Sequence, residues 1–450
     1  MLFRLLLAVV VLSPLPFGCN REWSWSLLCV LTALLCIAWS IGVLSNGIQA
    51  TRVLRALKWP IILYCLSMLW ALVQIIPNIN SQMLHPIWSL ASSTLQLDLP
   101  GFISTSPYDT VTAFMRLMSD GLIFLMSAHY CQSSQNTKTL FNWIAFAGFC
   151  YASYALIIFF GGYKSILWYE QSYTPTSSTF INRNSYATYA GLGILCCIPM
   201  LYEKIKISMH YGLKSNFGKQ YFIEKFIKQG WFVVINLIIS ITALLVTQSR
   251  GGVLSTLVAM VSLFLLLSLY KQNKQRIFTY LATGFLAFTA VLFQISGDKL
   301  MTRLNAIDVS SENRFDIYDL IIKGISSNRW YGMGYGTFEN SFRLYRDEKL
   351  PLHIKFGHNT YLENIFELGI PAALLLFAGI ALVALQCLRG TKVRQKNVHY
   401  PALGFSATVL VASHALTDFS LQIPAVAVTY AAILGAAFAQ SFGHRERTSR

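Results

Sequence analysis

Long apolar runs recur along this chain of 450 residues and constrain its fold more than any other feature. The runs extend over about 17–22 residues, which lets a helix cross roughly 30 Å of hydrocarbon. Hydrophobic residues make up 55% of the chain and charged residues only 12%, about half the charged share of a soluble domain. The sequence therefore predicts an all-α polytopic membrane protein.

The apolar runs predict about 12 transmembrane helices and one large loop. Residues 1–295 would hold the first nine spans, 296–358 the loop with short helices of its own, and 359–450 the last three spans and a tail. The expected spans are 3–18, 25–45, 59–76, 109–128, 139–160, 185–202, 231–247, 252–270, 277–295, 360–387, 402–421 and 424–442.

The first apolar stretch has two interpretations. "MLFRLLLAVVVLSPLPFGC" is apolar enough for a span, but it also resembles a signal peptide or a lipoprotein signal that ends at Cys19. Pro14 and Pro16 stand where a cleavage region needs small residues. We therefore favour a span over residues 3–18.

Basic residues predict which side of the membrane each loop faces. They give the chain a net charge of +16 and gather in the loops 46–58, 203–230, 271–276 and 388–400 and in the tail. With twelve spans these loops share one side, whereas the opposite segment 77–108 has no Lys or Arg. The positive-inside rule then places both termini in the cytoplasm. The charge indicates orientation and contact with anionic membrane lipids, and we expect no nucleic-acid partner.

Motifs for metals and nucleotide cofactors do not occur in the sequence. The eight histidines lack metal-ligand spacing, and most of the nine cysteines lie within expected spans, so they suggest no disulfide framework. No Walker or dinucleotide-binding fingerprint is found. We therefore expect no metal and no cofactor.

The large loop 296–358 carries many basic residues, yet a loop of this length can be translocated despite its charge. Its stretch "SSENRFDIYDLIIKGI" predicts an amphipathic helix that lies on the outer leaflet or caps the bundle. The following "GMGYG" indicates either a plain turn or an irregular backbone close to a ligand or another segment. The expected apolar face of the helix consists of Phe315, Ile317, Tyr318, Leu320, Ile321 and Ile322.

Arginines gather at the outward ends of the spans. Arg183 precedes the sixth span, Arg250 in "TQSRGG" lies between the seventh and eighth, and Arg314 belongs to the large loop. Any one of them alone is explained by snorkelling to lipid headgroups. Together they indicate a site for phosphate or diphosphate, which a guanidinium binds through a planar fork of donors. Arg116 within the fourth span is a further candidate, with a packing role equally open.

The stretch "KFGHNTYLENIFELG", residues 355–369, places ionisable groups where the chain enters the tenth span. Thr360-x-x-Glu363 predicts a capping box at the start of that helix. Capping does not explain His358, which can accept a proton near neutral pH. Nor does it explain Glu367, which needs a polar cavity or a partner at this depth.

The eleventh span ends in "SHALTDFSLQIP", where His414 and Asp418 would share one helix face at i,i+4. One interpretation is a mutually satisfied pair that closes the bundle. The other is a direct part in catalysis. The spacing alone favours the first.

Several of these motifs, taken in order, resemble the O-antigen ligase and polysaccharide polymerase superfamily. The motifs are "STFINRNSYA", "QSRGG", "GMGYGTF", "GHNTYLENIFELG" and "SHALTDFSLQIPAVA". One departure is "NRWYG", where members of the family often have a proline before the glycine-rich turn. The resemblance implies a GT-C-type glycosyltransferase of the bacterial inner membrane with a periplasmic active site.

The resemblance also implies the substrates and the site. The donor would be a glycan on undecaprenyl diphosphate, and the acceptor a glycan or lipid A–core. By position in the motifs, His358 and Arg250 would be catalytic. The residues expected to bind the diphosphate or the substrates are Arg183, Arg314, Asn359, Tyr361, Glu367 and Asp418.

The expected chemistry follows from these residue types. His358 would act as general base towards the acceptor hydroxyl, and the arginines would stabilise the leaving diphosphate. A single displacement would invert the anomeric centre. Ligase and polymerase both stay open, with polymerase slightly favoured by "SHALTDFSLQIP". A twelve-span transporter, a lipid-linked glycan flippase and a non-catalytic assembly protein are the alternatives from other classes.

Overall fold

The computed structural model describes the chain except for residues 46–51, 171–175, 213–217, 270–308, 347–353 and 444–450. In the described part almost all regular structure is helical, as predicted, and the exception is a two-stranded antiparallel hairpin of β1 (Ser165–Ile166) and β2 (Tyr169–Glu170). The helices are α1 (Leu2–Leu12), η1 (Phe17–Cys19), α2 (Glu22–Ser45), α3 (Arg52–Ala56), α4 (Lys58–Val73), α5 (Ile87–Leu95), α6 (Pro107–Tyr130), α7 (Ser134–Gly161), α8 (Arg183–Gly212), α9 (Gly218–Val246), α10 (Arg250–Ser268), α12 (Val309–Ser327), α13 (Phe338–Ser341), η2 (Phe342–Leu344), α14 (Thr360–Val393), α15 (His399–His414), η3 (Ser420–Gln422) and α16 (Pro424–Ala439).

Six of the described helices are long and apolar enough to cross a membrane: α2, α6, α7, α8 over Arg183–Ile205, α10 and α14. Shorter apolar helices accompany them, including α1, α4, α16 and Gly230–Val246 of α9. The chain is thus an all-α polytopic membrane protein. The count of twelve spans stays a prediction, and the expected ninth span, 277–295, lies outside the described residues.

The first expected span is shorter than predicted. Helix α1 ends at Leu12, after 11 residues, and the chain then turns through η1 with positive φ at Phe17, Gly18 and Cys19. A proline has no N–H to continue a helix, so Pro14 and Pro16 end the helix well before residue 18. The segment still packs inside the protein, because Thr179 donates a hydrogen bond of 2.7 Å to the Pro14 carbonyl.

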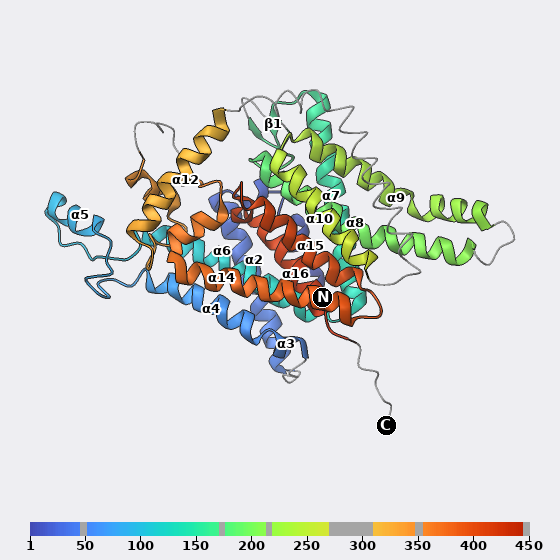
Figure 1. Ribbon diagram of the computed structural model, residues 1–450, viewed down its shortest axis with the longest axis horizontal. Coiled ribbons are helices and arrows are strands. Elements are labelled where there is room, and N and C mark those ends of the chain that lie inside the picture. The colour runs from blue at the N-terminus through green and yellow to red at the C-terminus, as the bar shows by residue number, and fades with distance from the viewer. Residues whose placement is uncertain (46–51, 171–175, 213–217, 270–308, 347–353, 444–450) are drawn as a thin grey trace.

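Helix α16 lies at the centre of the bundle. Every residue from Pro424 to Ala439 is buried, and the helix packs against α6, α15, α14 and α8 (Figure 1). A helix that is apolar on all sides is stable only when it is surrounded. Its alanines and Gly435, where an added Cβ would meet the Phe124 carbonyl oxygen of α6, let neighbouring backbones approach closely.

Helix α14 breaks at Gly369, where φ is 76° and ψ is 162°, two residues before Pro371. The break frees backbone groups that would be costly unpaired at membrane depth. The glycine loop, residues 332–336, pairs with them: the N–H groups of Met333 and Gly334 donate to the carbonyls of Phe366 and Glu367, both at 3.0 Å. The alternation of glycines is therefore an irregular backbone against another segment rather than a plain turn.

Replacing Gly332 by alanine should destabilise this junction. Gly332 has φ of 72°, and an added Cβ would collide with the backbone carbonyl of Glu367. We expect a loss of about 2–4 kcal/mol in the free energy of unfolding, since strain and overlap with backbone add. Thermal unfolding of the purified protein in detergent measures it. Gly42→Ala is the control, because Gly42 lies in a helix with nothing within 4 Å of the added atom. Equal stability of the two variants would contradict the close approach.

Helix α12 caps the bundle by packing on α14 (Figure 1). The predicted apolar face is only partly correct: Ile317 and Ile321 are 5% and 0% exposed, whereas Phe315 and Ile322 are 70% and 49% exposed. The buried pair contacts Phe366 and the short helices that follow the glycine loop. Through this contact α12 fixes the large loop against the first two turns of α14.

Candidate active site

The start of α14 is set by Asn359. Its side chain accepts hydrogen bonds from the N–H groups of Tyr361 and Leu362, at 3.0 and 3.1 Å. The predicted capping box is therefore wrong by one residue, because the extended backbone of Asn359 (φ −150°, ψ 103°) makes it the N-cap and Thr360 the first helical residue. Glu363 still reaches back, to the N–H of Gly357 at 2.8 Å.

His358 precedes the cap in a left-handed conformation, with φ of 51°. This conformation is uncommon for a residue with a Cβ and concentrates at functional positions. The hydroxyl of Tyr318 on α12 donates to the His358 carbonyl at 2.9 Å. The imidazole packs edge-on against Phe419, with ring centroids 5.1 Å apart. Two elements distant in sequence thus hold the ring in place.

The pKa of His358 is lowered from 6.5 to about 4. Burial is the main cause, and the positive charge of Arg314 acts in the same direction. Both disfavour the imidazolium. The ring is therefore neutral at physiological pH and has a lone pair with which to accept a proton.

The turn after α15, residues 415–420, corrects the prediction for the eleventh span. The helix ends at His414 rather than near residue 421, so Asp418 lies in the turn and not on the same helix face. Both side chains are at most 2% exposed, and His414 Nε2 lies 3.8 Å from Asp418 Oδ2. Thr360 fixes the turn, donating to the Asp418 carbonyl at 2.9 Å. The predicted pair therefore exists, but at 3.8 Å its two side chains interact only weakly where α15 ends.

Two of the predicted arginines interact with this turn, and the third starts a helix beside it. Arg314 of α12 donates to the Thr417 carbonyl at 3.3 Å. Asp418 interacts electrostatically with both Arg314 and Arg183, the first residue of α8. Arg250 begins α10, and a Cβ on the next residue would lie 3.0 Å from His414 and Thr417. We call Arg183, Arg250, Arg314 and His358 the arginine–histidine cluster.

His414 is more central to this cluster than the sequence indicated. Its Nδ1 lies 2.5 Å from the Thr188 hydroxyl of α8 and 3.3 Å from the Ser420 hydroxyl. The ring therefore ties α15 to α8, next to the start of α10. In the sequence, only the i,i+4 spacing of His414 and Asp418 indicated that they lie close together. They do, but because of the turn after α15 and not because they share a helix face.

Tyr361 and Glu367 lie away from the cluster. They line a separate cavity of about 980 Å³ among α4, α6, α14, α15 and α16. The Tyr361 hydroxyl donates to the Ala412 carbonyl at 2.9 Å. The Glu367 carboxylate accepts from the N–H of Phe338 at 2.9 Å, which fixes the chain after the glycine loop. Both side chains thus hold the fold as well as facing the cavity.

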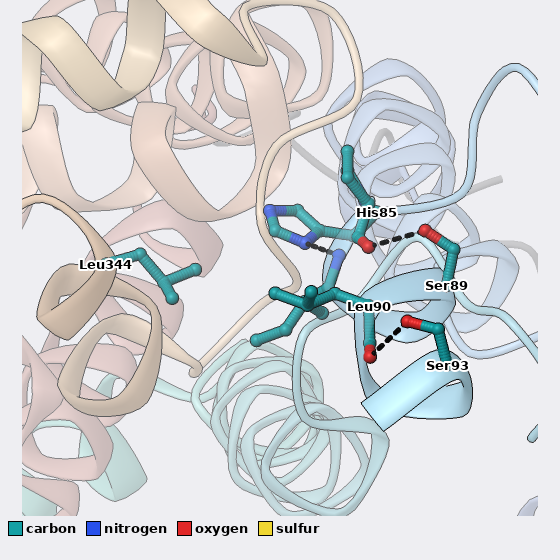
Figure 2. Close-up of a pocket in the computed structure, with 7 residues that line it drawn as sticks. His85, Ser89, Leu90, Ser93 and Leu344 are labelled. Carbon is teal, nitrogen blue, oxygen red and sulfur yellow. Dashed lines mark hydrogen bonds between the residues drawn. The ribbon is translucent and has the colours of Figure 1, made fainter. Parts of the chain in front are cut away.

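A second hollow lies beside α5 and has no comparable chemistry. Figure 2 shows His85, Ser89 and Ser93 around this space of about 680 Å³. The hydroxyls of Ser89 and Ser93 donate to the carbonyls of Pro86 and Leu90, and His85 Nδ1 accepts from a nearby N–H (Figure 2). Among the described residues that line it none is charged, so it offers nothing to a diphosphate.

Comparison with known proteins supports one family. No curated protein matches the chain. Residues 235–377 match the family model described as O-antigen ligase. This segment includes Arg250, Arg314 and His358, whereas Arg183 and Asp418 lie outside it. The match confirms the resemblance over the motifs that it covers, and this segment of the chain is similar to the O-antigen ligase family.

Proposed function

We propose that this protein transfers a glycan from undecaprenyl diphosphate to an acceptor hydroxyl on the periplasmic side of the inner membrane. The observation that carries the proposal is that Arg314, Arg183 and a neutral histidine lie at one turn, with Arg250 at the start of the helix beside it. A diphosphate needs several cationic donors, and an attacking hydroxyl needs a base. The family match supports the same class of reaction.

The donor's diphosphate binds to Arg183, Arg250 and Arg314 in this proposal. These residues come from the starts of α8 and α10 and from α12. Negative charge grows on the bridging oxygen as the anomeric carbon–oxygen bond breaks. Guanidinium groups that are already in place stabilise that charge without reorganisation. Asp418 partly balances them when the site is empty.

His358 takes the proton of the acceptor hydroxyl as its oxygen bonds to the anomeric carbon. One bond forms, one breaks, and undecaprenyl diphosphate leaves with inversion at the anomeric centre. The activated donor supplies the driving force, so the proposed reaction requires neither a nucleotide nor a metal. Both a second lipid-linked repeat unit and lipid A–core fit as acceptor.

The pH dependence of transfer should reflect the unusual pKa of His358. In the free enzyme the base stays unprotonated down to about pH 4, so kcat/KM should fall near pH 4 and not near 6.5. A bound diphosphate offsets Arg314 and favours the imidazolium, which raises the pKa. The acid limb of kcat should therefore lie at higher pH than that of kcat/KM. Initial rates from about pH 3 to 8 measure both, and coincident limbs near the ordinary histidine pKa would argue against His358 as base.

Reconstitution tests the proposal directly. The purified full-length protein is incubated with a synthetic undecaprenyl-diphosphate glycan and either a second lipid-linked unit or lipid A–core. We expect one undecaprenyl diphosphate released for each glycosidic bond, without ATP. The acceptor that yields product distinguishes polymerase from ligase. Movement of the donor across proteoliposomes without any new glycosidic bond would instead identify a flippase.

A further inference from the structure

The cavity of about 980 Å³ has a polar end and an apolar end. Helix α14 lines it along much of its length, and its first two turns contribute polar side chains such as Glu363, Asn364 and Glu367. After the break at Gly369 the same helix contributes Leu376, Phe377 and other apolar residues. Helices α4 and α16 pack against α14, and α6 packs against both of them (Figure 1). Such a gradient fits an amphipathic molecule, polar at one end and lipid-like at the other.

Two ionisable residues of α6, Arg116 and Asp120, line this cavity. Arg116 and Asp120 are four residues apart and so share a helix face. They attract each other electrostatically, yet they form no ion pair within 4 Å among the described residues. Arg116 Nε is buried without a hydrogen-bond partner there. Ionisable groups within a span are retained mainly where they meet a substrate or a partner.

Arg116 and Asp120 do not fix the backbone in the way that neighbouring carboxyl groups of the cavity do. Glu363 and Glu367 accept backbone N–H groups at 2.8 and 2.9 Å. Asp120, in contrast, accepts no backbone N–H in any hydrogen bond among the described residues, and the opposite charge that acts on it is that of Arg116. The Arg116 guanidinium lies 5.7 Å from the centre of the Trp25 ring. It also interacts electrostatically with Glu367, which places the pair at the polar end of the cavity.

The side chains that line the cavity disfavour phosphate as its ligand. Its carboxyl groups are Glu22, Asp109, Asp120, Glu339, Glu363 and Glu367. Only Arg116 and Lys355 among the described lining residues are cationic, and Lys355 lies 3.9 Å from Glu339. The lining therefore offers few of the cationic donors that a phosphate needs. A hydroxylated, uncharged group satisfies both partners, because hydroxyls donate to a carboxylate and accept from a guanidinium.

We propose that the Arg116–Asp120 pair binds an uncharged sugar of the acceptor, whose lipid part occupies the apolar end of this cavity. The inference rests on the proposed transferase function and adds the acceptor's chemical class. The arginine–histidine cluster then receives the anionic diphosphate, and the acidic cavity receives a neutral glycan. Segment 355–361 separates the two: Lys355, Phe356, Thr360 and Tyr361 line the cavity, whereas His358 belongs to the cluster.

Binding of defined probes tests this without any transfer reaction. A dodecyl glucoside with a photoreactive alkyl chain is crosslinked to the full-length protein in phosphatidylcholine nanodiscs, and labelled peptides are mapped by mass spectrometry. We expect labels on α6 and α14. Dodecyl maltoside should suppress labelling at concentrations at least about 10-fold lower than dodecyl glucuronide or dodecyl phosphate. Asp120→Asn and Arg116→Gln should each weaken labelling about 10-fold, since hydrogen bonds to charged groups are lost.

Controls separate this inference from the proposed function. Asp98→Asn removes an exposed carboxylate elsewhere and should leave labelling unchanged. His358→Ala should also retain it, so labelling and transfer can fail independently. Should Asp120→Asn not fold, the preference of the wild type among the three competitors still decides, and Arg116→Lys supplies a second variant that keeps the charge. Equal suppression by all competitors overturns the inference. Preference for dodecyl phosphate also overturns it and indicates a phospholipid or donor site.

Discussion

Replacing His358 by alanine should lower kcat for glycan transfer by about 10²–10⁴-fold, the usual contribution of a general base. The ring is neutral because burial and Arg314 depress its pKa to about 4. His414 also lies near Arg314, but its Nδ1 is already engaged by the hydroxyls of Thr188 and Ser420. Release of undecaprenyl diphosphate under saturating substrates measures the loss.

A second variant distinguishes lost chemistry from lost structure. His358 has φ of 51°, a conformation that asparagine tolerates better than alanine does. His358→Asn should therefore unfold at nearly the wild-type temperature while remaining as inactive as His358→Ala. His85→Ala, at the hollow beside α5, should retain full activity. A well-folded His358→Asn enzyme with normal kcat would rule out the proposed base.

Replacing Arg250 by lysine should lower kcat by about 10²–10³-fold, the range seen when one preorganised donor to a developing anion is removed. Lysine keeps the charge but loses the planar fork that binds two phosphate oxygens together. The fold should not suffer, since Ser249 caps α10 by accepting from the N–H of Gly252 at 3.2 Å. The same assay measures kcat and the donor KM.

The control for this substitution is an exposed arginine of the large loop. Arg329 is exposed, and its guanidinium lies over the Trp330 ring, 5.9 Å from its centre. Arg329→Lys should leave kcat within twofold of the wild type, as expected for a solvated side chain. If Arg250→Lys behaved in the same way, Arg250 would be a lipid-facing arginine and not a ligand of the diphosphate.

The sequence predicted the all-α membrane class correctly because that class depends on local composition. The apolar run of α14 and the amphipathic pattern of α12 can each be recognised from the residues of that segment alone. The limits of those helices were less predictable. The break at Gly369 and the early end of α15 at His414 depend on hydrogen bonds from distant segments, as when Thr360 donates to the Asp418 carbonyl.

Part of the candidate site could be predicted from the sequence, and part of it could not. Arg250 and His358 stood out from residue type and from motifs that resemble a known family. The cavity around Arg116 and Asp120 could not be foreseen, since spaces between helices follow from packing. Nor could the role of Asn359 as N-cap, which depends on one extended backbone residue.

By itself the sequence determined that this chain enters a membrane as helices and carries arginines and a histidine between them. The hydropathy of a segment depends on its own residues, so a membrane-spanning helix can be predicted without knowing what packs against it. Only the tertiary structure decided that Arg314 and His358 meet the turn after α15, while Glu367 faces a different cavity. Those contacts join residues up to about a hundred positions apart, and the packing of whole helices sets them.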